Sequence, residues 1–439
     1  MIRRARRPAE RASPRKADVP PEATTPIPTT DLSVDEIRLG QPETWLRPDR
    51  EGMFAKLRAE RPVSFHEEAD IPNFPRGPGF WAVTRYADVM QVSRDADTFI
   101  SGKGSNIADL PVELNEFFGS MINMDAPRHT KLRKLVNKGF TPRMVGLIEE
   151  QVKTQARAIV DQVAPRGECD FVRDVAAQLP LQVICDMMGI PRSDDARIFE
   201  LTNRILGAGD PEYAQTIEEL MAAGMELFQY AQALGEERLR EPREDITTAL
   251  MQAEVDGDRL TAQEFGSFFI LLVVAGNETT RNAISHGMKA LTDHPEQRDV
   301  WLRDFEAVSP SAVEEIVRWA SPVIHFRRTA TRDVVVGGTE IRAGDKVVMW
   351  YNSANRDERA FDDPFRFDVR RTPNEHVAFG AGGPHFCLGA NLARREIKVM
   401  FEELFRRLPD IEISSEPEML FSAFIHGIKR MRCRFTPAR

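Results

Sequence analysis

The sequence predicts a mainly helical fold with a minor β region, and three observations support this. Between residues 125 and 320, apolar residues recur at three- and four-residue spacing, as in segments 143–163 and 217–239, which indicates helices with one buried face. Short β-rich segments such as residues 80–84 lie near clusters of Asn, Pro and Gly, a pattern typical of strands between turns. No repeat of fixed period occurs, so a solenoid is not expected.

The last third of the chain is expected to return to strands before another helix. β-like segments cover residues 328–336 and 346–351, and residues 355–375 form a meander rich in Pro, Asp and Arg. A glycine-rich loop then leads into a helix over residues 388–408. The expected architecture is therefore a helical body that carries a small sheet.

Size and composition indicate one large domain behind a basic tail. The 439 residues, of which 42% are hydrophobic and 29% charged, suffice to bury a large core. No low-complexity linker divides the chain after residue 30, so we expect a single domain over residues 31–439. Residues 1–30 carry seven basic residues and six prolines, and we expect this segment to be disordered. It lacks the apolar centre of a secretory signal, and its prolines oppose an amphipathic transit helix.

The charge balance and the cysteines narrow the classes of function. A net charge of -9 argues against general nucleic-acid binding, because phosphates require basic surfaces. The longest apolar run, residues 268–275, is far shorter than the roughly 20 residues of a bilayer span, so we expect no transmembrane segment. The cysteines show no CxxC spacing, which predicts neither a disulfide framework nor a zinc site and favours the reducing cytoplasm. They are Cys169, Cys185, Cys387 and Cys433.

One cysteine, Cys387, lies at the junction between a glycine-rich loop and the start of a helix. The stretch from Phe379 to Gly389 reads FGAGGPHFCLG. Backbone amides at a helix N-terminus stabilise a thiolate, and glycines let a loop pass close to a flat ligand. This arrangement fits haem ligation by a thiolate, whereas a buried free cysteine is the commoner fate of an isolated Cys.

A second motif lies on an apolar helix that is expected to begin near Thr261, where Thr261 and Glu264 form a capping box. Its centre reads AGNETT over residues 275–280. Glycine and hydroxyl side chains weaken a buried helix, so we expect a bulge or kink that could hold a water. Such a site suits the delivery of protons to bound dioxygen while bulk water stays out. The alternative is that both threonines merely bond to their own helix and that Glu278 is solvated.

A third motif, Glu315-Ile316-Val317-Arg318, follows a helix start signal at Ser309-Pro310. A spacing of three residues places Glu315 and Arg318 on one helical face, where a local ion pair is the ordinary interpretation. The motif alone therefore assigns no function.

Together these motifs resemble the cytochrome P450 superfamily. Its signature is a Phe, a glycine-rich loop, a basic residue two positions before the cysteine and a Gly two positions after it. These parts are supplied by Phe379, Gly382, His385, Cys387 and Gly389. Phe379 lies one residue farther from the cysteine than is commonest, because the Gly383-Pro384 stretch is one residue longer. The resemblance implies the cytochrome P450 fold, a triangular helical body around haem with small sheets.

The resemblance also implies a role for each matching residue. The thiolate of Cys387 would bind the iron of haem b, and Thr279 with Glu278 would hold and relay protons. The structural triad of the family would be Glu315, Arg318 and Arg366. Further haem contacts are implied for Phe379, Gly382, Gly389 and Ala275, and propionate contacts for His129, Arg133, Arg328 and His385. The residues expected to line the substrate pocket are Leu271, Val274, Ala275, Ile324 and Phe424.

A thiolate-bound haem beside an acid–alcohol pair implies a monooxygenase, which splits O2 with two electrons and two protons and places one oxygen atom in a C–H bond. The chain shows no Rossmann, flavin or iron–sulfur segment of its own. We therefore expect a ferredoxin and a ferredoxin reductase to deliver the electrons, ultimately from NAD(P)H. A basic docking face is expected at Lys134, Lys138, Arg394 and Arg395, with simple solvation of these side chains as the alternative.

From about Trp45 to its end, the chain resembles mycobacterial-type enzymes that hydroxylate the terminal (ω) carbon of methyl-branched lipids. The matching stretches include LVVAGNETTRN at residues 272–282 and CLGANLARRE at residues 387–396. Relatives oxidise the side-chain terminus of cholesterol and cholestenone. The resemblance thus implies ω-hydroxylation of an isoprenoid or phytanate-like fatty acid, within lipid, cholesterol or steroid metabolism. The alternatives are a steroid side-chain hydroxylase, a non-enzymatic haem-thiolate sensor and a lipid carrier without haem.

Overall fold

The computed structural model describes residues 24–70, 76–139, 142–213, 216–254 and 257–438. Most of the segment that we expected to be disordered, residues 1–30, lies outside this description. Residues 24–30 contact the folded body instead. The Thr25 N–H donates to Asp363 Oδ1 (3.1 Å), and the Thr30 hydroxyl donates to Asp49 Oδ2 (2.7 Å). The folded part of the chain therefore begins before residue 31.

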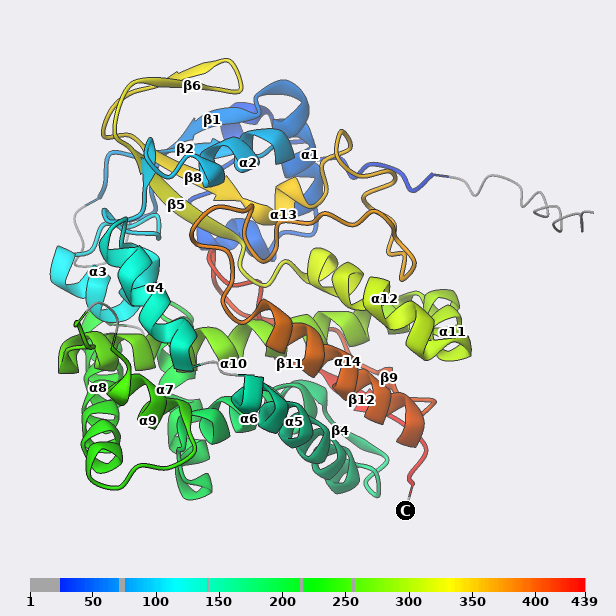
Figure 1. Cartoon of the computed structure of the whole chain (residues 1–439). Coiled ribbons are helices and arrows are strands. Elements are labelled where there is room, and N and C mark those ends of the chain that lie inside the picture. The colour runs from blue at the N-terminus through cyan, green and yellow to red at the C-terminus, as the bar shows by residue number, and fades with distance from the viewer. Residues whose placement is uncertain (1–23, 71–75, 140–141, 214–215, 255–256, 439) are drawn as a thin grey trace, which may run out of the picture.

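A five-stranded sheet lies at one end of the molecule, above the helices in Figure 1. Its strands in spatial order are β1 (Val63–His66), β2 (Phe80–Val83), β8 (Lys346–Trp350), β5 (His325–Ala330) and β3 (Phe99–Ile100). Neighbouring strands are antiparallel except β2 and β8, which are parallel. The strands predicted over residues 80–84 and 346–351 are therefore confirmed.

In the described residues, smaller sheets lie outside the five-stranded sheet. They pair β4 (Glu168–Asp170) and β9 (Glu412–Ile413) with β12 (Arg432–Arg434), β10 (Glu418–Met419) with β11 (Ile428–Arg430), and β6 (Val334–Val336) with β7 (Thr339–Ile341). The segment predicted as one β-like piece, residues 328–336, is divided between β5 and β6. A bend at residues 331–332 separates the two strands and sends them into different sheets.

Helices form the rest of the body, as predicted. They are α1 (Arg50–Glu60), α2 (Tyr86–Arg94), α3 (Val112–Gly119), α4 (Arg128–Gly139), α5 (Pro142–Val163), α6 (Gln178–Met188), α7 (Asp195–Leu206), α8 (Ile217–Arg240), α9 (Ile246–Gln252), α10 (Ala262–Asp293), α11 (Pro295–Arg303), α12 (Phe305–Ala320), α13 (Tyr351–Ala354) and α14 (Ala390–Arg407). Short helical turns add η1 (Val34–Glu36), η2 (Pro42–Leu46), η3 (Ser120–Asn123), η4 (Val172–Ala176) and η5 (Arg192–Asp194). The segments predicted as helices over residues 143–163 and 217–239 correspond to α5 and α8.

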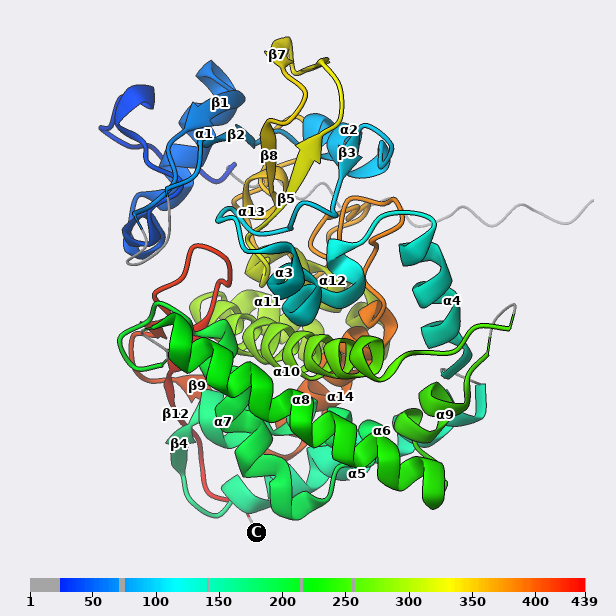
Figure 2. The same ribbon diagram turned by 90° about the vertical axis from the view of Figure 1, so that its left-hand side faces the viewer.

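The 32-residue helix α10 runs through the middle of the molecule in both views (Figures 1 and 2). The Thr261 hydroxyl accepts from the Glu264 N–H (3.1 Å), and the Glu264 carboxylate accepts from the Thr261 N–H (3.0 Å). This is the predicted capping box, and it satisfies amides that lack partners at a helix start. α10 contacts α3, α6, α7, α8, α12 and α14. These six helices are therefore arranged around it.

Helix α12 begins at Phe305, about one turn before the Ser309-Pro310 signal that the sequence indicated as its start. Phe305 stacks on Trp301 of α11, with ring centroids 5.2 Å apart. The Ser309 hydroxyl accepts from the Trp301 indole N–H (2.9 Å) and donates to the Phe305 carbonyl. Ser309 thus bonds inside the helix instead of capping it, and aromatic packing extends α12 toward its N-terminus.

The hydrophobic core has one large cluster and two smaller ones. The large cluster lies among the helices and includes the fully buried Val152, Val183, Phe269, Ile316 and Phe401. The smaller clusters lie on opposite faces of the five-stranded sheet, because alternate residues of β8 point into different clusters. Within the described ranges, no helix is both long and apolar enough to cross a bilayer.

Candidate active site

Two backbone hydrogen bonds close the loop that carries Cys387. The Cys387 N–H donates to the Phe379 carbonyl (2.9 Å), so the two ends of the predicted motif meet. The Phe386 N–H donates to the Gly383 carbonyl (3.3 Å). The chain then enters α14, the helix predicted over residues 388–408.

Glycines at positions 382 and 383 let this loop turn against α2. Gly382 and Gly383 have φ values of +81° and +83°, a region that residues with a side chain disfavour. A Cβ on Gly383 would lie 2.5 Å from the Ser93 carbonyl oxygen at the end of α2. The Ser93 hydroxyl also donates to the Gly382 carbonyl (2.9 Å). The longer Gly383-Pro384 stretch is therefore accommodated by a close approach to α2.

The Cys387 thiol lies just before the N-terminus of α14, as predicted. Desolvation raises the pKa of this thiol, whereas the Gly389 N–H, Arg133 and Arg394 act to lower it. Its side chain is nevertheless accessible to solvent. The neighbouring positive groups suit a thiolate that binds a metal ion.

Behind the loop, Arg394 of α14 connects Phe379 to α12. Its guanidinium lies 4.5 Å from the centroid of the Phe379 ring, and its Nη2 donates to Glu314 Oε2 (3.1 Å). His376 Nε2 lies 2.9 Å from the same carboxylate oxygen. Burial alone would raise the pKa of Glu314, but His376 and Arg394 lower it to about 2. Arg394 is thus partly exposed and paired with Glu314, and its expected role in docking stays a prediction.

Four basic side chains from three separate segments of the sequence meet beside the Cys387 loop. The rings of His129 and His385 lie 4.3 Å apart between their centroids. Arg133, one turn after His129 on α4, donates to the Phe386 carbonyl (2.9 Å). Arg328 of β5 is close enough to lower the pKa of both histidines. The structure therefore brings together the residues that were predicted to face the propionates.

Within the described residues, this basic group forms no ion pair, and the Asp125 carboxylate acts on His129 and Arg328 only from a greater distance. In the described part of the chain, no ion pair joins Arg133 or Arg328 to a carboxylate, and His129 Nε2 has no hydrogen-bond partner. Burial, together with Arg328, His129 and Arg133, lowers the pKa of His385 to about 3. Buried donors without an acceptor are costly, so the arrangement fits an anionic ligand. The two carboxylates of haem are ligands of that kind.

Sequence reasoning missed Ser101, whose hydroxyl lies 3.1 Å from His385 Nε2. The N–H groups of Ser101 and Gly102 donate to the Asp125 carboxylate at 2.7 and 2.8 Å. These bonds hold the segment after β3 close to the start of α4. No local pattern connects residues 101, 125 and 385, so the sequence carried no signal for this contact.

The acid–alcohol motif lies on α10 with its acid buried. Glu278 is 1% exposed and accepts through Oε1 from Asn282 (3.1 Å) and Arg281. The Thr279 hydroxyl donates to the Ala275 carbonyl (2.8 Å). Glu278 is therefore buried, which excludes the alternative that this acid is merely solvated. The bond from Thr279 to its own helix agrees with the alternative interpretation of the threonine.

The predicted bulge is absent from α10, which the structure describes without a gap. Every residue from Ala262 to Asp293 is α-helical. The physical reason is local, because the Thr279 hydroxyl bonds to a carbonyl one turn earlier without opening the helix. The weak helix formers are thus accommodated by side-chain bonding and by packing.

Open space lies beside the middle of α10. Ala275 is exposed and Leu271 and Thr279 are half-buried, although most of this helix is buried. Val274 between them is 9% exposed. Leu271, Val274 and Ala275 were predicted to line the substrate pocket, and an exposed alanine in a central helix is consistent with a ligand beside it.

The two remaining predicted pocket residues differ in their surroundings. Phe424 is half-buried, and its carbonyl accepts from the Ile324 N–H (2.9 Å). Ile324 is fully buried in the cluster that contains Trp45 and Trp350. The prediction that Ile324 lines the pocket is therefore wrong, because its side chain is used to fill the core. The preceding residue, Val323, is half-buried.

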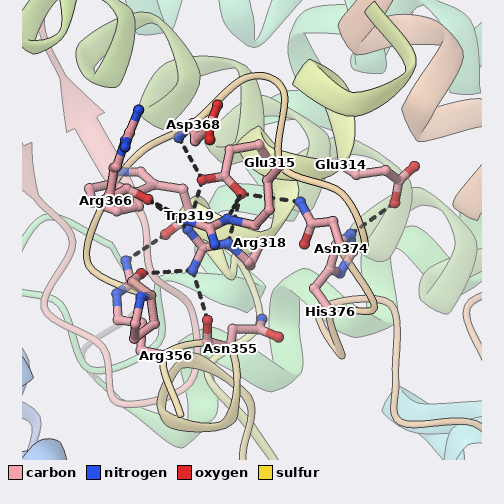
Figure 3. A network of polar contacts seen from close by, with 12 residues as sticks. Glu314, Glu315, Arg318, Trp319, Asn355, Arg356, Arg366, Asp368, Asn374 and His376 are labelled. Atoms are coloured by element: carbon pink, nitrogen blue, oxygen red, sulfur yellow. Dashed lines mark hydrogen bonds and ion pairs between the residues drawn. The ribbon is translucent and has the colours of Figure 1, made fainter. Parts of the chain in front are cut away.

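The predicted ion pair between Glu315 and Arg318 is completely buried (Figure 3). Arg318 Nε and Nη2 each donate to one carboxylate oxygen at 2.7 Å. Arg318 Nη1 also donates to the carbonyls of Asn355 (2.8 Å) and Pro364 (2.9 Å). Burial alone would raise the pKa of Glu315, but Arg318 and Arg371 outweigh it and lower the pKa.

The second guanidinium on Glu315 belongs to Arg371, so the prediction of Arg366 is wrong. Arg371 Nε donates to Glu315 Oε2 (3.1 Å). Arg366 supplies its carbonyl oxygen, which accepts from Arg371 (2.8 Å) and Arg318 (3.2 Å), while its side chain points away from Glu315 in Figure 3. Asn374 Nδ2 adds a further bond to Glu315 (3.1 Å). The meander is thus fixed behind the Cys387 loop.

Comparison with known proteins places this site in context. A profile described as cytochrome P450 matches residues 308–421. Methyl-branched lipid omega-hydroxylase of Mycobacterium tuberculosis is 52% identical over 409 residues, which cover 92% of this chain and 96% of that protein. Steroid C26-monooxygenase of the same organism is 42% identical over 393 residues, covering 87% and 89% of the two chains.

A solved structure is similar over nearly the same length. A cytochrome P450 of Mycobacterium marinum, in complex with pseudoionone, has a TM-score of 0.86 and 47% identity. The match covers 91% of this chain and 99% of the other. The arrangement of helices and sheets described above is therefore shared with a structure that was determined with a ligand.

Proposed function

Because this chain belongs to the cytochrome P450 family and is a monooxygenase, we propose that it hydroxylates the terminal (ω) carbon of methyl-branched lipids such as phytanate-like fatty acids. The observation that carries the proposal is the 52% identity with methyl-branched lipid omega-hydroxylase over almost the whole of both chains. Identity with steroid C26-monooxygenase is lower, at 42%.

Members of the family hold haem through a cysteine thiolate, and the group proposed here is haem b with Cys387 as its iron ligand. Phe379, Gly382, Gly389 and Ala275 would contact the ring. The unpaired basic group of His129, Arg133, Arg328 and His385 would hold the propionates, and Ser101 would orient His385. When bound, haem supplies the reductive cleavage of O2 and the insertion of one oxygen atom into a C–H bond.

Protons for this reaction would pass through Glu278 and Thr279. Asn282 and Arg281 hold Glu278 Oε1, whereas Oε2 has no hydrogen-bond partner in the described residues. That free oxygen can accept a proton and release it again. The Thr279 hydroxyl donates to Ala275, so its lone pairs remain available to accept a hydrogen bond from a water. Chemistry of this kind argues against a haem sensor, which needs no proton relay.

The substrate would lie against the apolar side chains beside α10. Leu271, Val274, Ala275 and Phe424 offer no charge to a ligand. An apolar lining binds a hydrocarbon chain and keeps bulk water away from the reacting carbon.

Electrons would come from a ferredoxin and its reductase, with NAD(P)H as the ultimate source. The proposal also places the protein in the cytoplasm. Arg394 is partly exposed and paired with Glu314, so it would contribute less charge to the proposed docking face. Lys134 is exposed and Arg395 half-buried, while the Lys138 side chain lies outside the described residues. The docking face would therefore centre on Lys134 and Arg395.

The experiment uses the purified holoenzyme with a working ferredoxin and reductase. Phytanate and cholestenone are supplied separately, and products are identified by mass spectrometry. We expect the ω-hydroxylated branched acid to form with the higher kcat/KM. The proposal would be contradicted if neither compound were oxidised. A higher kcat/KM for cholestenone would favour the second candidate, a steroid side-chain hydroxylase, which the 42% identity supports.

A further inference from the structure

Two cysteines outside the active site lie directly opposite each other on paired strands. Cys169 of β4 and Cys433 of β12 are register partners in an antiparallel pair. Their Sγ atoms are 3.3 Å apart, and both thiols are free. The Cys433 Sγ also lies 3.6 Å from the Cys169 carbonyl oxygen. The side chains therefore already point toward one another.

The backbone at this pair has the spacing that a disulfide requires. The Phe171 N–H donates to the Met431 carbonyl (2.8 Å), and the Phe435 N–H donates to the Gly167 carbonyl (2.9 Å). Hydrogen-bonded and non-hydrogen-bonded pairs alternate along an antiparallel ladder. The cysteine pair lies two positions from each of these two bonded pairs, so it also occupies a hydrogen-bonded position. The Cα atoms of such a pair are about 5.5 Å apart, within the range of about 4.4 to 6.8 Å found across disulfides.

A small oxidant can reach one of the two thiols. Cys169 is half-buried and lines a cavity of about 740 Å³, whose walls also include Val172, Phe199, Arg281 and Met431. Cys433 is fully buried behind it. The attack would therefore begin at Cys169, and the resulting intermediate would be resolved by the neighbouring Cys433.

We propose that Cys169 and Cys433 form a reversible disulfide when the protein meets a hydroperoxide. Hydrogen peroxide oxidises the Cys169 sulfur to a sulfenic acid and releases one water as its O–O bond breaks. The Cys433 sulfur then attacks, the S–S bond forms, and a second water leaves. In total, two thiols lose two electrons and two protons, and one peroxide becomes two waters. A dithiol reductant restores both thiols.

The bond would fix the C-terminal strand to the segment between α5 and α6. The cross-link would join β4 to β12, and β12 also pairs with β9 on its other side. A cross-link across a long loop restricts the unfolded chain, and the oxidised form should resist unfolding better than the reduced form. The hydrogen bond with Cys433 and burial raise the pKa of the Cys169 thiol, so the reaction should accelerate as the pH rises.

The test treats full-length holoenzyme with hydrogen peroxide and then blocks the remaining thiols with an alkylating reagent. Peptide mapping without reductant should yield one cross-linked species that joins Cys169 to Cys433, with the mass of two hydrogen atoms lost. Dithiothreitol should remove it, and the melting temperature should be higher for the oxidised protein. Recovery of both cysteines only as alkylated or sulfinic species would overturn the proposal.

Matched variants separate this disulfide from other oxidation. Cys433→Ala should lose both the cross-linked peptide and the oxidation-dependent rise in melting temperature. Cys185→Ala should retain both, because Cys185 is fully buried in the helical core. A rise in melting temperature that persists in Cys433→Ala would count against the proposal even if that variant were less stable overall.

Discussion

The imidazole rings of His129 and His385 lie 4.3 Å apart between their centroids, although one belongs to α4 and the other to the Cys387 loop. Burial and the neighbouring guanidiniums together lower the pKa of both rings, for His385 to about 3. Both rings are therefore neutral at pH 7, beside the charged Arg133 and Arg328. An anion placed among these four side chains would offset an unfavourable concentration of positive charge.

Replacement of Arg328 by Met should weaken haem binding. A charge-assisted hydrogen bond contributes about 1.5–3 kcal/mol, so haem should dissociate about 10- to 100-fold faster from Arg328→Met. The rate is measured by transfer of haem to an excess of a haem-scavenging protein. Without haem, the variant should be at least as stable as the wild type, because a buried cation without a carboxylate partner has been removed.

Arg327 provides a matched control for this variant. It precedes Arg328 on the same strand, but its guanidinium pairs with Asp109 (2.7 Å) and with the carbonyls of Lys103 and Asn106. Arg327→Met should lower the melting temperature with little change in the haem dissociation rate. Equal dissociation rates for the two variants would contradict the assignment of Arg328 to a propionate.

Replacement of Thr279 by Ala should separate electron transfer from product formation. The hydroxyl that would position a proton donor is lost, while α10 keeps its backbone bonds. We expect NAD(P)H consumption to continue and product per NAD(P)H to fall steeply, because loss of an acid–base group typically slows the step that it serves by about 100-fold or more. Thr280→Val is the control. The Thr280 side chain is buried, so its replacement should leave the amount of product per NAD(P)H unchanged. Full coupling in Thr279→Ala would disprove this role.

Much of the fold and of the site could be predicted because the signals are local. The capping box at Thr261 and the glycine loop before Cys387 depend on residues within a few positions of each other, so their geometry follows from spacing alone. The helical periodicity of α5 and α8 is equally local. The family resemblance then brought distant parts together, and it correctly placed His129 beside His385.

The predictions that failed concern choices made by long-range packing. Arg366 and Arg371 lie five positions apart in a meander without periodicity, and only the folded chain decides which side chain reaches Glu315. An apolar Ile324 would suit either a substrate pocket or the core, and the fold places it in the core beside Trp350.

Replacement of Arg371 by Met should destabilise the protein more than the same change at Arg366. Arg371 donates through its side chain to the fully buried Glu315, whereas Arg366 joins the network around Glu315 through its carbonyl. Loss of one partner from a buried ion pair costs about 3–5 kcal/mol. Urea unfolding of haem-free protein should show that loss for Arg371→Met and a clearly smaller one for Arg366→Met. The reverse order would restore the original prediction of Arg366.

Mild acid should destabilise the fold through a buried histidine pair. His286 Nε2 donates to the His426 carbonyl (3.1 Å), the rings lie 4.0 Å apart, and the facing cations are Arg50 and Arg356. Burial lowers the pKa of His286 to about 4 from 6.5. Because the unfolded chain binds a proton below about pH 6.5 and the folded chain does not, His286 should reduce the free energy of unfolding by about 2 kcal/mol between pH 7 and pH 5.

His286→Gln keeps a donor for the carbonyl and does not titrate, so urea unfolding at both pH values should show a smaller loss for this variant. Equal losses for variant and wild type would show that His286 is not responsible.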